Sequence, residues 1–291
     1  MQRSGLHGVG MTGESITEFR IELPPRGDVV GWELGDPDAP RGVGILPGLG
    51  DHAGRYVPVG AALAARGFAA QAIDLPGHGK SYGKRGHVAS WNEYRDAVTA
   101  WMDRAKAAAP ARRWSLLGQS MGAFVALDWA LSNPGRVERL ILCAPPFQLA
   151  FRPSMLKVKA AQLLVRVWPG FSQGNMILPS MLSHDPEIVR EHAMDPLVHY
   201  QITARLFLEF QAMRSALKKR ARDLSIPTLL LHGGADPIAD PEGTKRWAEA
   251  APPGMATLRL YPTLYHEVLK EIGREKIIAS MIDWLEDSGA R

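Results

Sequence analysis

Three residues of this sequence could together perform nucleophilic catalysis: Ser120, Asp236 and His266. A serine hydroxyl is a poor nucleophile at neutral pH. It needs an imidazole to accept its proton and a carboxylate to hold that imidazole in the right tautomer. Ser120 lies in the pentapeptide GQSMG (118–122), which fits the pattern G-x-S-x-G. Because 29 of the 291 residues are glycine, the pattern alone is weak evidence, and its meaning depends on its setting.

The residues on either side of Ser120 predict a strand before it and a helix after it. Residues 114–117 (WSLL) form an apolar run, and residues 121–133 (MGAFVALDWALSN) carry apolar residues at helical spacing. A nucleophile elbow requires this order, with small residues where the tight turn brings backbones together. The alternative role for Ser120 is the N-cap of the helix. The pentapeptide does not distinguish the two roles.

The carboxylate and imidazole candidates each follow a predicted strand. Asp236 comes after the apolar run 228–232 and a glycine pair, where the alternative is a turn-forming aspartate. His266 comes just after the predicted strand 258–261, where the alternative is a structural histidine. In the α/β-hydrolase fold the catalytic residues occur along the chain in the order serine, aspartate, histidine, and each follows a parallel strand. These placements favour Ser120 as the nucleophile, His266 as the base and Asp236 as the orienting acid.

Attack on an ester creates an oxyanion, which requires two preorganised N–H donors. In this arrangement one donor is the backbone of the residue after the nucleophile, here Met121, and the other comes from a loop after an earlier strand. That loop is residues 47–50 (PGLG). Since Pro47 has no N–H, we expect the backbone N–H of Leu49 to be the second donor.

The elements that must position these residues alternate regularly along the chain. The predicted strands are 43–46, 69–73, 114–117, 140–144, 228–232 and 258–261, and the predicted helices lie near 56–66, 90–108, 121–133, 242–251 and 276–286. This alternation predicts a mostly parallel central sheet flanked by helices, an α/β fold. Two earlier strands, 16–23 and 29–34, joined by the turn PPRG, predict an antiparallel edge.

The alternation stops after the predicted strand 140–144, which is the sixth strand when the two N-terminal strands are counted. Between Pro145 and about Leu224 the pattern is mostly helical and richer in Met and Leu, which predicts a helical cap over the strand ends. We therefore expect a hydrolase core formed by residues 15–145 and 225–291, with a cap or lid at 146–224. The glycine-rich residues 1–14 are expected to be a loose tail.

Six segments of the chain carry a family resemblance: LPGLGDHAGRY (46–56), DLPGHGKSYGKRGHV (74–88), GQSMG (118–122), DPLVHY (195–200), TLLLHGGADPI (228–238) and YPTLYHEVL (261–269). Together they resemble the monoacylglycerol lipases of the α/β-hydrolase superfamily. The resemblance runs from about residue 14 to the C-terminus and includes the cap.

The resemblance implies hydrolysis of monoacylglycerols, or of similar single-chain esters, to fatty acid and glycerol through an acyl-enzyme on Ser120, without a cofactor. Two departures from the family pattern stand out. Pro47-Gly48 replaces the usual His-Gly, and Gly122-Ala123 replaces the common Gly-Gly. The expected oxyanion donor lies two residues after Pro47, so we expect the oxyanion hole to be preserved.

Composition excludes several other classes of function. The 34 basic and 30 acidic residues leave a formal charge of +4 without a dense Lys/Arg cluster, so we expect no nucleic-acid partner. The single cysteine, Cys143, excludes an intramolecular disulfide, and the spacing of the histidines suggests no metal site. The sequence shows neither the apolar region of a signal peptide nor an apolar run long enough to span a bilayer. We therefore expect a cytoplasmic protein.

Within the predicted cap, residues 152–171 carry polar residues on a narrow helical stripe and are otherwise apolar. We interpret residues 155–168 as a lid that walls the acyl chain and dips into lipid surfaces, which would associate the protein peripherally with membranes. The substrate-contacting candidates are Leu163, Leu164 and Val167. The alternative is an ordinary helix packed on the core.

Other enzymes could use the same catalytic residues. A lysophospholipase or a broad-specificity carboxylesterase would need the same triad, and only their substrates would distinguish them. A non-catalytic small-molecule receptor on this fold is a further alternative, against which the intact triad argues. An epoxide hydrolase or dehalogenase requires an aspartate at the position of Ser120.

Overall fold

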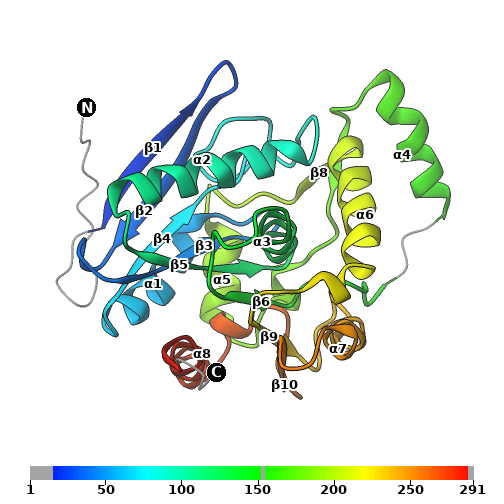
Figure 1. The fold of residues 1–291 in the computed structure, drawn as a ribbon. Helices are drawn as coiled ribbons and strands as arrows, with labels where there is room; N and C mark the ends of the chain where they lie inside the picture. The colour runs from blue at the N-terminus through cyan, green and yellow to red at the C-terminus, as the bar shows by residue number, and fades with distance from the viewer. Residues whose placement is uncertain (1–15, 152–154, 288–291) are drawn as a thin grey trace.

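An eight-stranded sheet forms the centre of the structure, a computed structural model that describes residues 16–151 and 155–287 (Figure 1). Its strand order is β1-β2-β4-β3-β5-β6-β9-β10. The strands are β1 (Thr17–Leu23), β2 (Gly27–Leu34), β3 (Arg41–Leu46), β4 (Phe68–Ile73), β5 (Arg113–Gln119), β6 (Leu140–Cys143), β9 (Thr228–Gly233) and β10 (Ala256–Tyr261).

The sheet is parallel from β4 to β10 and antiparallel at one edge. β1 pairs with β2 and β2 pairs with β4 in antiparallel register, whereas β3, β5, β6, β9 and β10 run parallel to β4. Every residue of β4, β6 and β9 is buried, because helices cover both faces of a parallel sheet. The predicted α/β-hydrolase architecture, with its antiparallel N-terminal edge, is confirmed.

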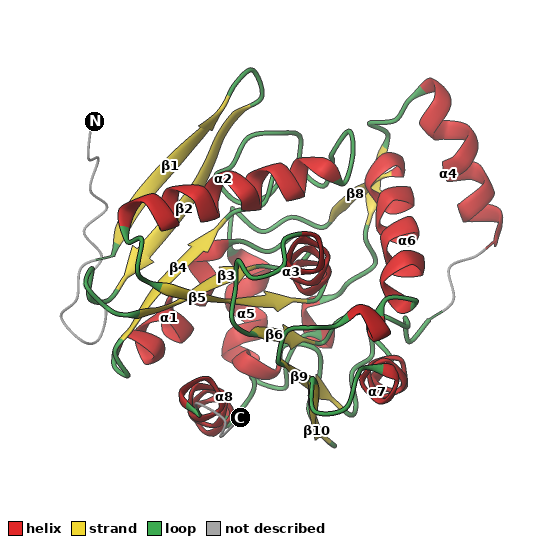
Figure 2. Ribbon diagram, viewed as in Figure 1, coloured by secondary structure: helices red, strands yellow, loops and turns green. Residues whose placement is uncertain are grey.

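Helices cover both faces of this sheet (Figure 2). The helices of the core are α1 (Val57–Ala64), α2 (Asn92–Ala108), α3 (Met121–Ser132), α7 (Pro241–Ala250) and α8 (Arg274–Glu286). α2, α3 and α7 contribute to one apolar cluster, and α1 and α8 contribute to a second cluster on the opposite face. Cys143 is fully buried in the second cluster, as a small hydrophobic residue.

The described part of segment 146–224, which lies between β6 and β9, contains three α-helices and a short pair of antiparallel strands. Its elements are α4 (Met155–Val167), β7 (Ser172–Gly174), α5 (Pro186–Met194), β8 (Gln201–Thr203) and α6 (Ala204–Lys218). β7 and β8 form a separate antiparallel pair. The sequence did not predict this pair, since three-residue strands are too short to produce an alternating pattern.

The two halves of this segment differ in their attachment to the core. Its second half is hydrogen-bonded to core loops, from His199 N to Gly50 O (3.0 Å) and from Thr203 N to Gly86 O (2.9 Å). α4 instead packs mainly on α6 at the outside of the molecule (Figure 1).

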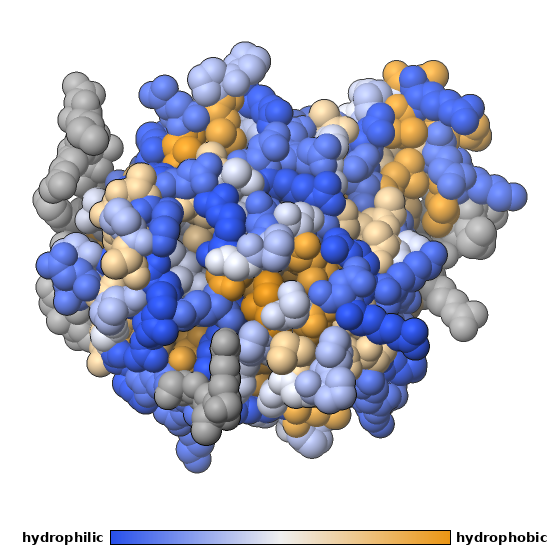
Figure 3. All heavy atoms as spheres, viewed as in Figure 1, coloured by the Kyte–Doolittle hydropathy of each residue, from blue (hydrophilic) through white to orange (hydrophobic). Residues whose placement is uncertain are grey.

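Large apolar side chains are exposed in and beside α4, where Figure 3 shows hydrophobic atoms on the surface. The exposed ones in this segment are Phe151, Leu163, Val167, Trp168, Phe171, Met176, Leu178, Met194 and Tyr200. None of the helices in the described ranges has the length and apolarity needed to cross a membrane. The predicted tail at residues 1–14 lies outside the described residues.

Candidate active site

Ser120 lies in a sharp turn between β5 and α3. Its backbone has φ 52° and ψ −116°, a conformation that costs energy for a residue with a Cβ atom. Ser120 stands at the N-cap position of α3, but its side chain makes no capping hydrogen bond to the helix. The turn is fixed from behind by the backbone hydrogen bond from Ser120 N to Cys143 O (2.8 Å).

The two glycines of the pentapeptide make this turn possible. A Cβ atom on Gly118 would lie 2.3 Å from the carbonyl oxygen of Gly122. A Cβ atom on Gly122 would lie 2.2 Å from the carbonyl oxygen of Leu46, at the end of β3. The start of α3 thus packs directly against β3 and β5, and only residues without a side chain fit there.

Asp236 and His266 meet at the ends of neighbouring strands. His266 Nδ1 lies 2.7 Å from Asp236 Oδ2, and both side chains are buried. Asp236 Oδ1 also accepts hydrogen bonds from the backbone N–H groups of Ile238 (2.8 Å) and Ala239 (3.0 Å). Asp236 therefore does stabilise a turn, as its alternative role supposed, and the same carboxylate contacts His266 through its other oxygen.

The pKa values of this pair move apart. Burial opposes ionisation of Asp236, but the charge of His266 and the hydrogen bonds from His232 and His266 outweigh it and hold the Asp236 pKa well below its usual range. Burial would lower the pKa of His266, but the charge and hydrogen bond of Asp236 outweigh burial and raise that pKa above its ordinary value. Asp236 therefore stays ionised, and His266 is a stronger base than an ordinary histidine.

Ser120 and His266 line the same small pocket, together with Leu49. Since Asp236 occupies Nδ1 of His266, the nitrogen left to face a substrate is Nε2. Ser120 and His266 make no hydrogen bond to each other in the described part of the chain. Such bonds are often long without substrate and tighten when it binds.

Leu49, one expected oxyanion donor, lines the pocket of Ser120, and Met121, the other, follows Ser120 in the chain. Residues 48–51 form a tight turn in which Asp51 N donates to Gly48 O (3.3 Å) and Gly50 has φ +80°. The N–H of Leu49 takes no part in that hydrogen bond. Met121 is the first residue of α3, where backbone N–H groups have no intrahelical partner. Among the described residues, neither the N–H of Leu49 nor that of Met121 has a hydrogen-bond partner.

Several pocket residues were not identified from the sequence. The polar residues that line the pocket besides Ser120 and His266 are Asp51, Gln119, Asn175, His192, His199, Tyr200 and Glu267. Gln119 Nε2 donates to the backbone oxygen of His266 (3.1 Å), which ties the serine turn to the histidine loop. Asp51, Gln119 and Glu267 lie within the segments that carry the family resemblance, as do His199 and Tyr200, and could have been noticed. Asn175 and His192 could not, because nothing in their local sequence indicates that they turn toward Ser120.

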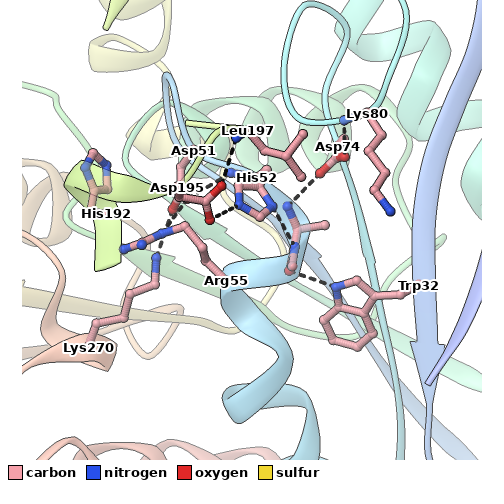
Figure 4. A network of polar contacts seen from close by, with 12 residues as sticks. Trp32, Asp51, His52, Arg55, Asp74, Lys80, His192, Asp195, Leu197 and Lys270 are labelled. Carbon is pink, nitrogen blue, oxygen red and sulfur yellow. Dashed lines mark hydrogen bonds and ion pairs between the residues drawn. The ribbon is translucent and has the colours of Figure 1, made fainter. Parts of the chain in front are cut away.

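Four buried charged side chains form a network beside the pocket, and Figure 4 labels three of them, Asp51, Arg55 and Lys270. Arg55 Nε forms an ion pair with Asp51 Oδ1 at 2.9 Å, and Lys270 Nζ donates a hydrogen bond to Asp51 Oδ2 at 2.9 Å. Lys270 Nζ also lies 3.2 Å from Glu267 Oε1. Burial opposes ionisation of Asp51, but the charges of Lys270 and Arg55 outweigh it and hold the Asp51 pKa well below its usual range. Two acids and two bases leave the network without net charge, which makes its burial tolerable.

Loops around the pocket are joined by further polar contacts (Figure 4). His52 Nε2 lies 2.8 Å from Asp195 Oδ2, which joins the loop after β3 to segment 146–224. Asp74 accepts backbone hydrogen bonds from Ala53 (2.7 Å) and Lys80 (2.6 Å) and joins two core loops. These contacts indicate that His52 and Asp74 hold the loops beside the pocket together.

The remaining histidines give no indication of a metal centre. Burial, followed by the charge of His199, lowers the pKa of His78 to about 3, so His78 is neutral near pH 7. His184 contacts the carboxylate of Glu271 (2.8 Å), and His192 contacts the hydroxyl of Tyr200 (3.1 Å). Within residues 16–151 and 155–287, no group of three or more His, Cys, Asp or Glu side chains is arranged to hold a metal ion.

Comparisons with known proteins agree with this geometry. The model of the Hydrolase_4 family, described as Serine aminopeptidase, S33, matches residues 38–273. A monoacylglycerol lipase of Mycolicibacterium smegmatis is 29% identical over 257 residues, which is 87% of this chain and 91% of that protein. A monoglyceride lipase of Rattus norvegicus is 31% identical over 232 residues, 78% of this chain and 76% of that protein.

Among solved structures, the crystal structure of Paleococcus ferrophilus monoacylglycerol lipase superposes with a TM-score of 0.78 at 29% identity, covering 93% of this chain and 98% of that one. The protein is thus a hydrolase of esters. The chain belongs to the Hydrolase_4 (Serine aminopeptidase, S33) family and, among the α/β-hydrolases, to the family of the monoacylglycerol lipases.

Proposed function

We propose that the protein hydrolyses monoacylglycerols to fatty acid and glycerol, with Ser120, His266 and Asp236 as its catalytic triad. The observation that carries this proposal is the 2.7 Å contact between Asp236 and His266, beside a strained Ser120 in one shared pocket. The names of the two lipase relatives supply the substrate class.

The reaction follows from the positions of these groups. His266 Nε2 takes the Ser120 proton as the hydroxyl oxygen bonds to the ester carbonyl carbon, and the carbonyl electrons move to its oxygen. The tetrahedral intermediate collapses, the bond to the glycerol oxygen breaks, and His266 gives its proton to that oxygen. Water, deprotonated by His266, then attacks the acyl carbon. The bond to the Ser120 oxygen breaks, His266 returns its proton to that oxygen, and the fatty acid leaves. The N–H groups of Leu49 and Met121 stabilise the oxyanion in both steps.

The polar lining of the pocket suits an alcohol with free hydroxyl groups. Asp51, Asn175, His199 and Tyr200 present hydrogen-bonding atoms around Ser120, and a glycerol leaving group has two hydroxyls to match them. A simple alkyl ester would offer no partner to His199 Nε2, a buried nitrogen without a hydrogen-bond partner among the described residues, and an unpaired buried polar atom costs binding energy. This lining supports a monoacylglycerol over a simple ester.

Segment 146–224 acts as a cap in this proposal, with α4 as the lid. Leu163 and Val167 are 67% and 82% exposed, so they do not pack on the core as the alternative reading of this helix requires. Leu164 is half-buried on the same helix. Exposed Trp168 lies at the end of α4, and an aromatic ring beside aliphatic side chains suits a lipid surface. These exposures support peripheral contact with lipid through the cap.

A panel of substrates tests the proposal. Fatty acid release is measured from monoacylglycerols of graded chain length, beside di- and triacylglycerols, a lysophospholipid and short alkyl esters. We expect kcat/KM to be highest for a monoacylglycerol. A maximum with the lysophospholipid would make the protein a lysophospholipase, and equal rates on all single-chain esters would make it a carboxylesterase. Ligand binding without turnover of any ester would indicate a receptor.

A further inference from the structure

One buried histidine that has no part in the reaction above contacts the proposed triad. His232, in β9, is fully buried, and its Nε2 atom lies 3.1 Å from Asp236 Oδ2. This is the same carboxylate oxygen that contacts His266 Nδ1 at 2.7 Å. The described structure therefore places two imidazoles on one oxygen of Asp236.

The surroundings of His232 determine which nitrogen carries its proton. Nε2 also lies 3.1 Å from the backbone oxygen of Ala239, and both the carboxylate and the carbonyl can only accept. Nε2 is therefore protonated and donates toward Asp236. Nδ1 lies 2.8 Å from the hydroxyl of Thr244, in α7, which lies 3.3 Å from the backbone oxygen of Pro145. Whichever way that hydroxyl points, the donor on Nε2 is retained.

We propose that His232 is a positioning residue, which holds Asp236 in place and, by sharing the negative charge on Oδ2, sets the basicity of His266. The inference rests on the proposed roles of Asp236 and His266. Asp236 has two backbone donors on Oδ1 and two imidazole donors on Oδ2. Loss of the His232 donor leaves more charge on Oδ2 for His266, which stabilises the imidazolium and raises the His266 pKa. It also frees one side of the carboxylate to move.

Other charged and polar groups face His266, and among the residues that the structure describes none of them is hydrogen-bonded or ion-paired with His232. Glu267 and Lys270 act on His266 from its own loop, and Lys270 is paired with Asp51 from the loop after β3. From segment 146–224, His192, His199 and Tyr200 face the same pocket. A substitution at His232 leaves these groups in place, so a changed pH profile reports on Asp236 and His266.

The test compares two substitutions of His232. His232→Met removes the donor at similar volume, whereas His232→Gln can place an amide N–H near Asp236 and an oxygen near Thr244. For His232→Met we expect kcat to fall on the order of tenfold, because the triad is less well held. The acid limb of its pH profile should move upward by roughly half a pH unit or more, the size expected for one lost hydrogen bond. His232→Gln should restore both values toward wild type.

Leu230→Ala is the matched structural control. Leu230 is fully buried on the same strand but does not contact Asp236, so this variant should lose stability while keeping the wild-type pH profile. If His232→Met folds and its acid limb is unchanged or moves downward, the inference is wrong. If His232→Met does not fold, Thr244→Val tests the inference instead, because loss of the Thr244 hydroxyl makes His232 a weaker hydrogen-bond donor to Asp236. An upward shift supports the inference, and an unchanged profile overturns it.

Asp236→Asn separates this inference from the proposed function. If that variant is as active as wild type, Asp236 is not the orienting acid and the proposed triad fails. If it is inactive while His232→Met behaves as wild type, the triad stands and only the role of His232 is rejected.

Discussion

The backbone carbonyl of Gly50 accepts a hydrogen bond from the backbone N–H of His199 at 3.0 Å. This contact joins the turn that carries Leu49, the proposed oxyanion donor, to segment 146–224. The two backbone segments also approach each other closely. A Cβ atom on Gly50 would lie only 2.2 Å from the carbonyl oxygen of His199. The position of the oxyanion turn therefore depends on a residue about 150 positions later in the sequence, and not on the residue type at Pro47 alone.

Gly50→Ala should impair catalysis as well as stability. The new methyl group forces the turn and His199 apart, which displaces the Leu49 N–H, and we expect kcat/KM to fall on the order of 10–100-fold. Gly67→Ala is the control: Gly67 has φ +76° and no atom within 4 Å of an added Cβ. That variant should lose roughly 1–2 kcal/mol of stability and keep its activity. Equal activity of the two variants would refute this role of the turn.

Ser120→Ala should abolish turnover and labelling by a fluorophosphonate, because the reacting oxygen is lost, while the fold is retained. Ser115→Ala removes the hydroxyl of a buried serine in β5, the strand that precedes Ser120, and should label like wild type. Labelling is followed by mass spectrometry of the intact protein. Wild-type stoichiometry in Ser120→Ala would show that another residue is the nucleophile.

Asp236→Asn should lower kcat on the order of 10⁴-fold, as loss of the orienting carboxylate does in other triads. The comparison is Asp240→Asn, four residues later, which alters the carboxylate that caps α7 but does not contact His266. Its kcat should stay within about threefold of wild type. A loss of less than about tenfold in Asp236→Asn would assign the acid to another residue.

The pH dependence of kcat/KM should follow the titration of His266. The base must be neutral to accept the Ser120 proton, so activity falls as the pH drops through the His266 pKa. Asp236 raises that pKa, and the acid limb should therefore lie above the ordinary value of 6.5. Because the Asp236 pKa is held low, it should add no second limb between about pH 5 and 8. A limb below 6.5, or a flat profile, would contradict this environment for His266.

The sequence predicted the parts of the site that depend on local pattern. Apolar strand runs and the glycines around Ser120 were sufficient for the α/β-hydrolase architecture and for the order of Ser120, Asp236 and His266. Each of these residues follows a strand, and the carboxyl ends of parallel strands meet at one edge of the sheet. Proximity within the site could therefore be inferred without coordinates.

The polar lining could not be predicted in this way. His199 and Asn175 reach the pocket because β7 pairs with β8 across the intervening α5, and because the Gly50 contact holds the chain near Ser120. Such long-range pairing leaves no periodic signal in the sequence. The role of His232 could not be predicted from the sequence either. In the sequence His232 is one polar residue near the end of an apolar strand, and its contact with Asp236 depends on the turn between the two residues.

For α4, the proposed lid, the structure distinguishes three side chains that the sequence treated alike. Leu163 and Val167 are exposed and Leu164 is half-buried, so single replacements by Ser should separate two effects. Leu163→Ser and Val167→Ser should keep the melting temperature. If these side chains enter lipid, each loses roughly 1.5–3 kcal/mol of burial, which is about tenfold or more in kcat/KM on aggregated long-chain monoacylglycerol.

A short, dissolved ester reaches Ser120 without a lipid surface, so its kcat/KM should change little in the same variants. Leu164→Ser is the internal control, because it removes apolar area from a partly buried position and should lower the melting temperature and both activities together. The decisive quantity is the ratio of long-chain to short-ester activity for each variant, measured with vesicles and without them. If the ratio for Leu163→Ser and Val167→Ser equals that of wild type, α4 does not act as a lipid-contacting lid, and the exposed apolar side chains need another explanation.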